Sequence, residues 1–356
     1  MSVPGRFWVP GPVEVDPDVQ AAMLRPVIGH RTRAGHLLAE RIQRGLKRMF
    51  GIDRPVIVAT CSATGLMESA IRSGVRERLL AVVSGTFGER FARIAERCGK
   101  EVVRLHVPRG TSLEPAQLES MLDGPPVDAV SLVHVETSTG ALAPVAELIP
   151  LFRRLGDVVT IVDAVGSFGG MPVTPEEWDA DFVIAASQKA MALPPGLAFA
   201  VASDRFLSRA LGIDDRGLYL DAIALHHAAD DGRFPQTPVL PVLHALDRQL
   251  ERIIEGGIDG RFERHRLMRE RVEHWAMHQS NLSIIAPRGR RSDTVTALRL
   301  PEQTSSAAVI GLLDDAGYQV ASGLDQDLPG VIRIGHMGDG SLDQLSQLLA
   351  TLDAVV

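Results

Sequence analysis

The sequence predicts an α/β protein with a large domain built on a mostly parallel sheet and a smaller C-terminal α+β domain. Three observations support this fold class. The 356 residues exceed the roughly 250 to 300 residues that a single core can hold. Short apolar runs alternate with helical segments through residue 202. This alternation stops near Glu255, where long helical segments take its place.

Continuous apolar runs are the expected strands of the large domain. Their lack of polar alternation indicates a sheet that is covered by helices on both faces. Helical segments between the runs imply crossover connections, and therefore parallel neighbours. A seven-stranded sheet follows from the runs at residues 56–59, 79–83, 101–107, 129–135, 158–163, 181–185 and 198–202.

Helical segments are recognised by apolar residues that recur with a spacing of about 3.6. The clearest example is 36–50, where Leu38, Ile42, Leu46 and Met49 share one face. Further helices are expected at 16–25, 65–73, 87–98, 146–155, 239–255, 261–279, 305–316 and 342–352, and strands of the small domain at 294–300 and 331–334. The expected division is an N-terminal segment (1–15), a large domain (16–255) and a small domain (256–356).

The composition favours a well-packed globular protein that works in a reducing cytoplasm. Hydrophobic residues make up 45% and charged residues 23% of the chain. A net charge of −7, with scattered arginines, argues against nucleic acid as a partner, and the absence of long apolar runs argues against a signal peptide or membrane span. Cys61 and Cys98 lack the spacing of a disulfide framework or a zinc site, so no metal is expected.

Asp163 and Lys189 each follow an apolar strand, at the position where open α/β sheets bind ligands. Lys189 is one of only three lysines in a chain that otherwise uses arginine. A carboxylate keeps a pyridine nitrogen protonated and a lysine amine condenses with an aldehyde, so the pair predicts a site for pyridoxal 5'-phosphate (PLP). The alternative is an ordinary strand-end aspartate and a surface lysine.

Two further segments carry polar groups in places that favour binding. The turn Thr60–Gly65 lies between a strand and a helix, where amide groups bind phosphate, although its hydroxyl groups could simply cap the helix. Arg333 stands in an apolar strand, where a substrate carboxylate or a structural ion pair would satisfy it. His30, His134 and His336 are expected to be core residues without a catalytic role.

Together these motifs resemble the class V aminotransferases of PLP fold type I, in particular the alanine/serine-glyoxylate aminotransferase group. The resemblance covers nearly the whole chain. It rests on Pro10–Val13, Ile28–Arg31, Ser62–Glu68, Ser84–Arg90, Glu136–Gly140, Val162–Ser167, Ser187–Lys189, Leu193–Gly196 and Arg333–Gly338.

The resemblance implies a role for each residue of the cofactor site. Lys189 would hold PLP as a Schiff base and move the substrate proton, and Asp163 would pair with the ring nitrogen. The other implied contacts are Phe87 and Val165 on the two ring faces, Ser138 at the ring hydroxyl, and Ser62, Ala63, Thr64 and Gln188 around the phosphate.

The resemblance also implies a homodimer with shared active sites. Thr237 would reach the phosphate of the partner subunit, and Gly29 would line the partner's substrate pocket. Three positions depart from the family pattern: Phe234 replaces a tyrosine, Ala63 a glycine and Phe87 a tryptophan. An alanine amide still donates a hydrogen bond and a phenyl ring still stacks, so the cofactor chemistry is expected to persist.

The implied activity is the transfer of an amino group from alanine or serine to a 2-oxo acid such as glyoxylate or pyruvate, with Arg333 holding the α-carboxylate. Other class V donors, namely aspartate, ureidoglycine and aminophosphonates, are alternatives, as are a lyase and a catalytically silent homologue. A cysteine desulfurase is disfavoured, because that group needs a cysteine in the C-terminal part, whereas Cys61 and Cys98 lie upstream.

Overall fold

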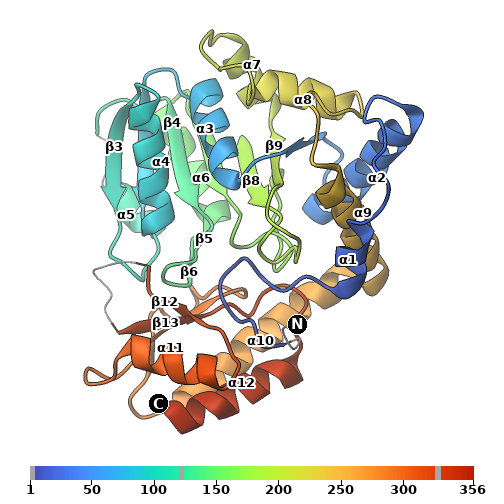
Figure 1. The fold of residues 1–356 in the computed structure, drawn as a ribbon. Helices are drawn as coiled ribbons and strands as arrows, with labels where there is room; N and C mark the ends of the chain where they lie inside the picture. The colour runs from blue at the N-terminus through green and yellow to red at the C-terminus, as the bar shows by residue number, and fades with distance from the viewer. Residues whose placement is uncertain (1–4, 120–123, 325–329) are drawn as a thin grey trace.

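The central feature of the chain is a seven-stranded sheet (Figure 1). The computed structural model describes residues 5–119, 124–324 and 330–356. In spatial order the strands are β1 (Val56–Ala59), β9 (Ala198–Ala202), β8 (Phe182–Ala186), β7 (Val159–Asp163), β4 (Ala129–Val133), β2 (Arg78–Val83) and β3 (Glu101–His106). The predicted fold class and the predicted seven strands are confirmed.

The sheet is mostly parallel, as predicted. Strands β3, β2, β4, β7 and β8 pair in parallel, whereas β9 runs antiparallel to both β8 and β1. The carboxyl ends of β7 and β8 therefore lie at the same edge of the sheet. Asp163 is the last residue of β7, and Lys189 follows the end of β8.

Two layers of helices cover the two faces of the sheet. On one face lie α2 (Arg33–Phe50), α6 (Val145–Phe152) and α9 (Leu240–Gly256). On the other face lie α3 (Ala63–Gly74), α4 (Thr86–Arg97), α7 (Asp204–Leu211) and α8 (Ala222–Asp230). Side chains alternate between the faces along a strand, so Asp163 points to the same side as Ile161, toward the layer of α3 and α4.

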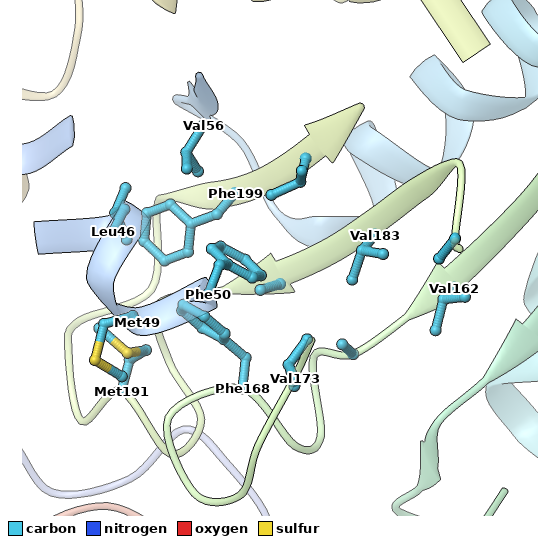
Figure 2. Close-up of a cluster of buried hydrophobic side chains, with 14 of the residues drawn as sticks. Leu46, Met49, Phe50, Val56, Val162, Phe168, Val173, Val183, Met191 and Phe199 are labelled. Carbon is cyan, nitrogen blue, oxygen red and sulfur yellow. The ribbon is translucent and has the colours of Figure 1, made fainter. Parts of the chain in front are cut away.

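The loops that carry the candidate site residues are anchored in the core on the α2 side (Figure 2). The ring of Phe168, five residues after the end of β7, stacks on Phe50 of α2 with a centroid distance of 4.1 Å. Met191, two residues after Lys189, is fully buried in the same cluster. Burial of large apolar side chains on both loops restrains the positions of their polar neighbours.

A second, four-stranded antiparallel sheet lies toward the C-terminus. Its order is β10 (Ser283–Ile284), β11 (Thr296–Arg299), β13 (Val331–Ile334) and β12 (Ala321–Ser322). Three helices pack with it: α10 (Ile258–Met277), α11 (Ser306–Asp315) and α12 (Leu342–Val355). Trp8 from the N-terminal segment enters the same core. The division into two domains at Glu255 stays a prediction.

The remaining elements are short. They are α1 (Pro17–Ala22), α5 (Pro115–Glu119), the hairpin of β5 (Val135–Glu136) and β6 (Ala141–Leu142), and a 3-10 turn, η1 (Arg153–Leu155). The first and the last fall within the predicted helices 16–25 and 146–155, whereas the two between them were not expected as separate elements. The hairpin matters most, because it places Glu136 beyond the carboxyl end of β4. Within the three described ranges, no helix combines the length and apolarity that crossing a membrane requires.

Candidate active site

Asp163 and Lys189 are both buried at the carboxyl edge of the large sheet. Asp163 is 2% exposed, and its Oδ1 accepts a hydrogen bond of 2.8 Å from the amide of Val165. Lys189 is 8% exposed, and its Nζ donates to the carbonyl oxygen of Pro10. Lys189 is therefore not the surface lysine of the alternative interpretation.

Burial changes the ionisation of both groups. It raises the pKa of Asp163 to about 6, and the negative charge of Glu136 adds to this rise. Burial lowers the pKa of Lys189 to about 8, and the positive charge of Arg333 lowers it further. Roughly a tenth of such lysine is neutral at pH 7. Only the neutral amine attacks a carbonyl carbon, so this environment favours condensation with an aldehyde.

The N-terminal segment packs against Lys189 through Gly11, a position that has room only for glycine. Gly11 has a φ of +87°, and a Cβ on it would lie 2.5 Å from Cδ of Lys189. Glycine permits both the left-handed backbone and the close approach. The segment therefore lies directly on the lysine, which the sequence did not indicate because the two residues are far apart in the chain.

The turn after β1 leaves the N-terminus of α3 open. Ser62 is the N-cap residue, yet its side chain makes no capping hydrogen bond. The capping explanation of this hydroxyl is therefore wrong, while the free amides of Ala63 and Thr64 suit a phosphate. Cys61 is no candidate nucleophile, because burial raises its thiol pKa to about 11.

Phe87, in the first turn of α4, lies next to the lysine. Its ring centroid is 6.0 Å from Nζ of Lys189 and 4.7 Å from the guanidinium carbon of Arg90. Arg90 also donates to the hydroxyl of Thr64 at 3.3 Å. Arg90 thus joins the aromatic ring to the open end of α3. No role for Arg90 could be predicted from the sequence, because one arginine among many is not distinctive.

Glu136 is a second buried carboxylate in this region, with 1% exposure. Its Oε1 accepts from the amide and hydroxyl of Ser138, at 3.1 and 2.8 Å, and its Oε2 accepts from the amide of Phe87 at 3.0 Å. Glu136 belongs to one of the motifs that resemble the aminotransferase family, but no role was predicted for it. Its place after an apolar strand is the same signal that selected Asp163, and could have found it.

Arg333 reaches the site from the small sheet. The residue is 6% exposed, and its guanidinium donates to the carbonyl oxygens of Ser322 (2.7 Å) and Thr137 (3.0 Å). Thr137 precedes Ser138, and the charge of Arg333 lowers the pKa of Lys189. The guanidinium of Arg333 therefore contacts the residue next to Ser138 and is near enough to Lys189 to act on it through its charge.

Two predicted residues lie on the surface of a single chain. Thr237 is exposed and borders a crevice formed with Thr60 and Tyr219, while Phe234 is buried behind it. Gly29 is exposed just before α2. Gln188 is half-buried beside Lys189. Any role of Thr237 and Gly29 in a partner's site requires a second chain.

Two of the histidines are satisfied core residues, in line with the prediction. Nδ1 of His134 lies 2.8 Å from the hydroxyl of Ser167. Both ring nitrogens of His336 are hydrogen-bonded, to the hydroxyl of Thr296 and to the carbonyl oxygen of Asp293. Burial lowers the pKa of His134 to about 3 and that of His336 to about 4, so both rings are neutral at pH 7.

Comparison with known proteins gives consistent matches. A family model described as Aminotransferase class-V matches residues 39–335. An uncharacterized aminotransferase of Methanocaldococcus jannaschii is 34% identical, over 98% of this chain and 91% of its own length. The serine-glyoxylate aminotransferase of Methylorubrum extorquens is 32% identical, over 99% of this chain and 90% of its own. The structure of an alanine-glyoxylate aminotransferase of Nostoc sp. superposes with a TM-score of 0.91 at 28% identity, covering 100% of this chain and 96% of the other.

Proposed function

Because the chain belongs to the class V aminotransferase family, whose members are PLP-dependent transaminases, we propose that it transfers the amino group of alanine or serine to glyoxylate or pyruvate. The family membership confirms the resemblance seen in the motifs. The single observation that carries the proposal is the buried pair of Asp163 and Lys189, with the buried Arg333 near enough to influence the charge of the lysine. The names of the relatives from Methylorubrum and Nostoc support the choice of substrates.

The residues present fit PLP by their chemistry. Lys189 offers a partly neutral amine, and the open N-terminus of α3 offers amides for a phosphate. Asp163 has a pKa of about 6, so at pH 7 it is mostly ionised and able to pair with a protonated ring nitrogen. When bound, PLP supplies an electron sink that stabilises negative charge on the substrate's α-carbon.

Each side chain of the site has a separate proposed role toward the cofactor. Lys189 would bind the aldehyde carbon and afterwards carry the proton at the α-carbon, as a general base and acid. Phe87 would stack on the ring and Val165 would pack on its other face. Ser138 would reach the ring hydroxyl and accept a hydrogen bond from it, because its own proton is donated to Glu136. The remaining proposed contacts hold the phosphate: Ser62, Ala63, Thr64, Gln188 and, from the partner subunit, Thr237.

Arg333 is the proposed holder of the substrate carboxylate. Its guanidinium is oriented by two backbone carbonyl groups, one of them on Thr137. A guanidinium presents two parallel N–H groups, which match the two oxygens of a carboxylate. Every α-amino acid and every 2-oxo acid carries such a carboxylate, so one arginine serves both half-reactions.

The proposed working form is a homodimer in the cytoplasm. Large apolar side chains are exposed close to each of the two residues assigned to the partner's site. Leu24 and Val27 precede Gly29, and Tyr219 lines the crevice with Thr237. An interface between two copies of the chain would cover these side chains. The unpaired cysteines support a reducing compartment.

A donor panel tests the proposed substrates. Alanine, serine and aspartate are each incubated with the PLP-loaded protein and either glyoxylate or pyruvate, and the amino acids formed are quantified. We expect glycine to accumulate from glyoxylate most rapidly with alanine or serine as donor. A clear preference for aspartate, or transfer to neither acceptor, would refute the substrate assignment and leave the family membership intact.

A further inference from the structure

The carboxylate of Glu136 joins two parts of the proposed cofactor site that come from different elements. Phe87 lies at the start of α4, whereas Ser138 follows β5. Oε1 of Glu136 accepts the two hydrogen bonds from Ser138, and Oε2 accepts the one from Phe87. No neutral side chain of this shape accepts at both oxygen positions, because an amide replaces one oxygen with a donor.

The surroundings of Glu136 are shaped around its side chain. A Cβ on Gly85 would lie 2.5 Å from Cδ of Glu136 and 2.7 Å from the hydroxyl of Ser138. The backbone of Glu136 is held independently, by the pairing with Ala141 and by the amide of Gly140, which donates to its carbonyl oxygen at 2.8 Å. The side chain therefore serves the site, while the hairpin has its own hydrogen bonds.

Four charged groups influence Lys189. Asp163 at the end of β7 and Glu136 on β5 are acidic, whereas Arg90 on α4 and Arg333 on β13 are basic. The two carboxylates raise the pKa of Lys189 and the two guanidinium groups lower it. Glu136 thus acts on the lysine through its charge as well as on Phe87 and Ser138 through its hydrogen bonds.

We propose that Glu136 is a positioning residue, whose carboxylate fixes Phe87 and Ser138 in one arrangement against the cofactor and balances the positive charge around Lys189. This inference rests on the proposed PLP site. In this role Glu136 contacts protein groups and not the cofactor. Loss of its carboxylate should therefore weaken cofactor binding without removing a group that reacts.

Glu136→Gln is the principal test. The change keeps the shape of the side chain but removes its charge and one acceptor. Titration of the cofactor-free protein with PLP should show a dissociation constant raised about tenfold, the size expected for one lost charge-assisted hydrogen bond. The pH midpoint of the absorbance of bound PLP should fall, because the negative charge of Glu136, which favours the protonated form of the Lys189 amine, would also favour the protonated form of that nitrogen when it is bonded to PLP.

Three further variants separate the two effects. Glu136→Asp keeps the charge but shortens the reach, so PLP affinity should fall while the pH midpoint stays nearer that of the wild type. Ser138→Ala should lower affinity without lowering the midpoint. Glu147→Gln is the control, since Glu147 lies on α6 with its side chain 56% exposed, and both readouts should be unchanged.

Thermal unfolding of each cofactor-free variant completes the experiment. If Glu136→Gln has the PLP affinity and the pH midpoint of the wild type, the positioning role is refuted and the proposed function is unaffected. If the wild type does not bind PLP, the proposed function itself is refuted. If both variants at position 136 unfold while Ser138→Ala folds, Glu136 serves folding, and the positioning role is refuted.

Discussion

Replacing Lys189 with alanine should reduce the transamination rate by at least the 10²- to 10⁴-fold that a positioned proton carrier contributes. The rate falls because the variant lacks the amine that binds the aldehyde and moves the substrate proton. PLP should still bind, noncovalently, through Asp163, Phe87 and the N-terminus of α3. The rate is measured with the donor and acceptor that prove best in the panel, in the presence of saturating PLP.

The small number of lysines provides a matched control. Lys47, half-buried on α2, and Lys100, whose Nζ donates to the carbonyl oxygen of Arg76, are the only others. After borohydride reduction of the PLP-loaded wild type, the added mass should lie on the peptide with Lys189. Full activity in Lys189→Ala, or added mass at Lys47 or Lys100, would show that the wrong lysine was assigned.

Arg333→Ala should lower kcat/KM for the amino donor by roughly ten- to a hundredfold. The expected loss is that of a charge-assisted hydrogen-bonded grip, about 1.5 to 3 kcal/mol. Most of the change should appear in KM, because the carboxylate is held in both the ground state and the transition state. Steady-state kinetics across donor concentrations at saturating acceptor measure the two constants separately.

Two variants accompany this measurement. Arg333→Lys keeps the charge but loses the paired N–H groups, so its KM should lie between those of the wild type and the alanine variant. Arg299→Ala removes an exposed arginine at the end of β11 and should leave KM unchanged. An unchanged KM in Arg333→Ala would reassign Arg333 to a structural role.

Most of the sheet could be predicted from the sequence, because its central strands are buried on both faces and appear as unbroken apolar runs. The direction of a strand leaves no such trace, so the antiparallel course of β9 could not be read from the run at 198–202. The run at 129–135 also appeared as one strand. The structure divides it at His134, whose amide donates to the carbonyl oxygen of Asp163.

The candidate site could be predicted only where a single residue carried the signal. Asp163 and Lys189 stand at strand ends, so local pattern was sufficient. The link from Phe87 to Glu136 spans 49 positions, and that from Pro10 to Lys189 spans 179. Contacts between residues so far apart in the sequence depend on the tertiary fold and cannot be predicted from local spacing. The role of Ser62 could likewise not be predicted from the sequence, because helix caps and phosphate-binding turns contain the same small hydroxyl residues.

The spectrum of the wild-type protein during one half-reaction shows whether Asp163 and Lys189 belong to a transaminase site. Protein loaded with PLP should be yellow, and addition of alanine or serine without an acceptor should convert the bound cofactor to its pyridoxamine form with loss of the visible band. Addition of glyoxylate should restore the band. A protein that stays colourless with PLP, or a band that no amino donor changes, would contradict the assignment of Asp163 and Lys189 to a transaminase site.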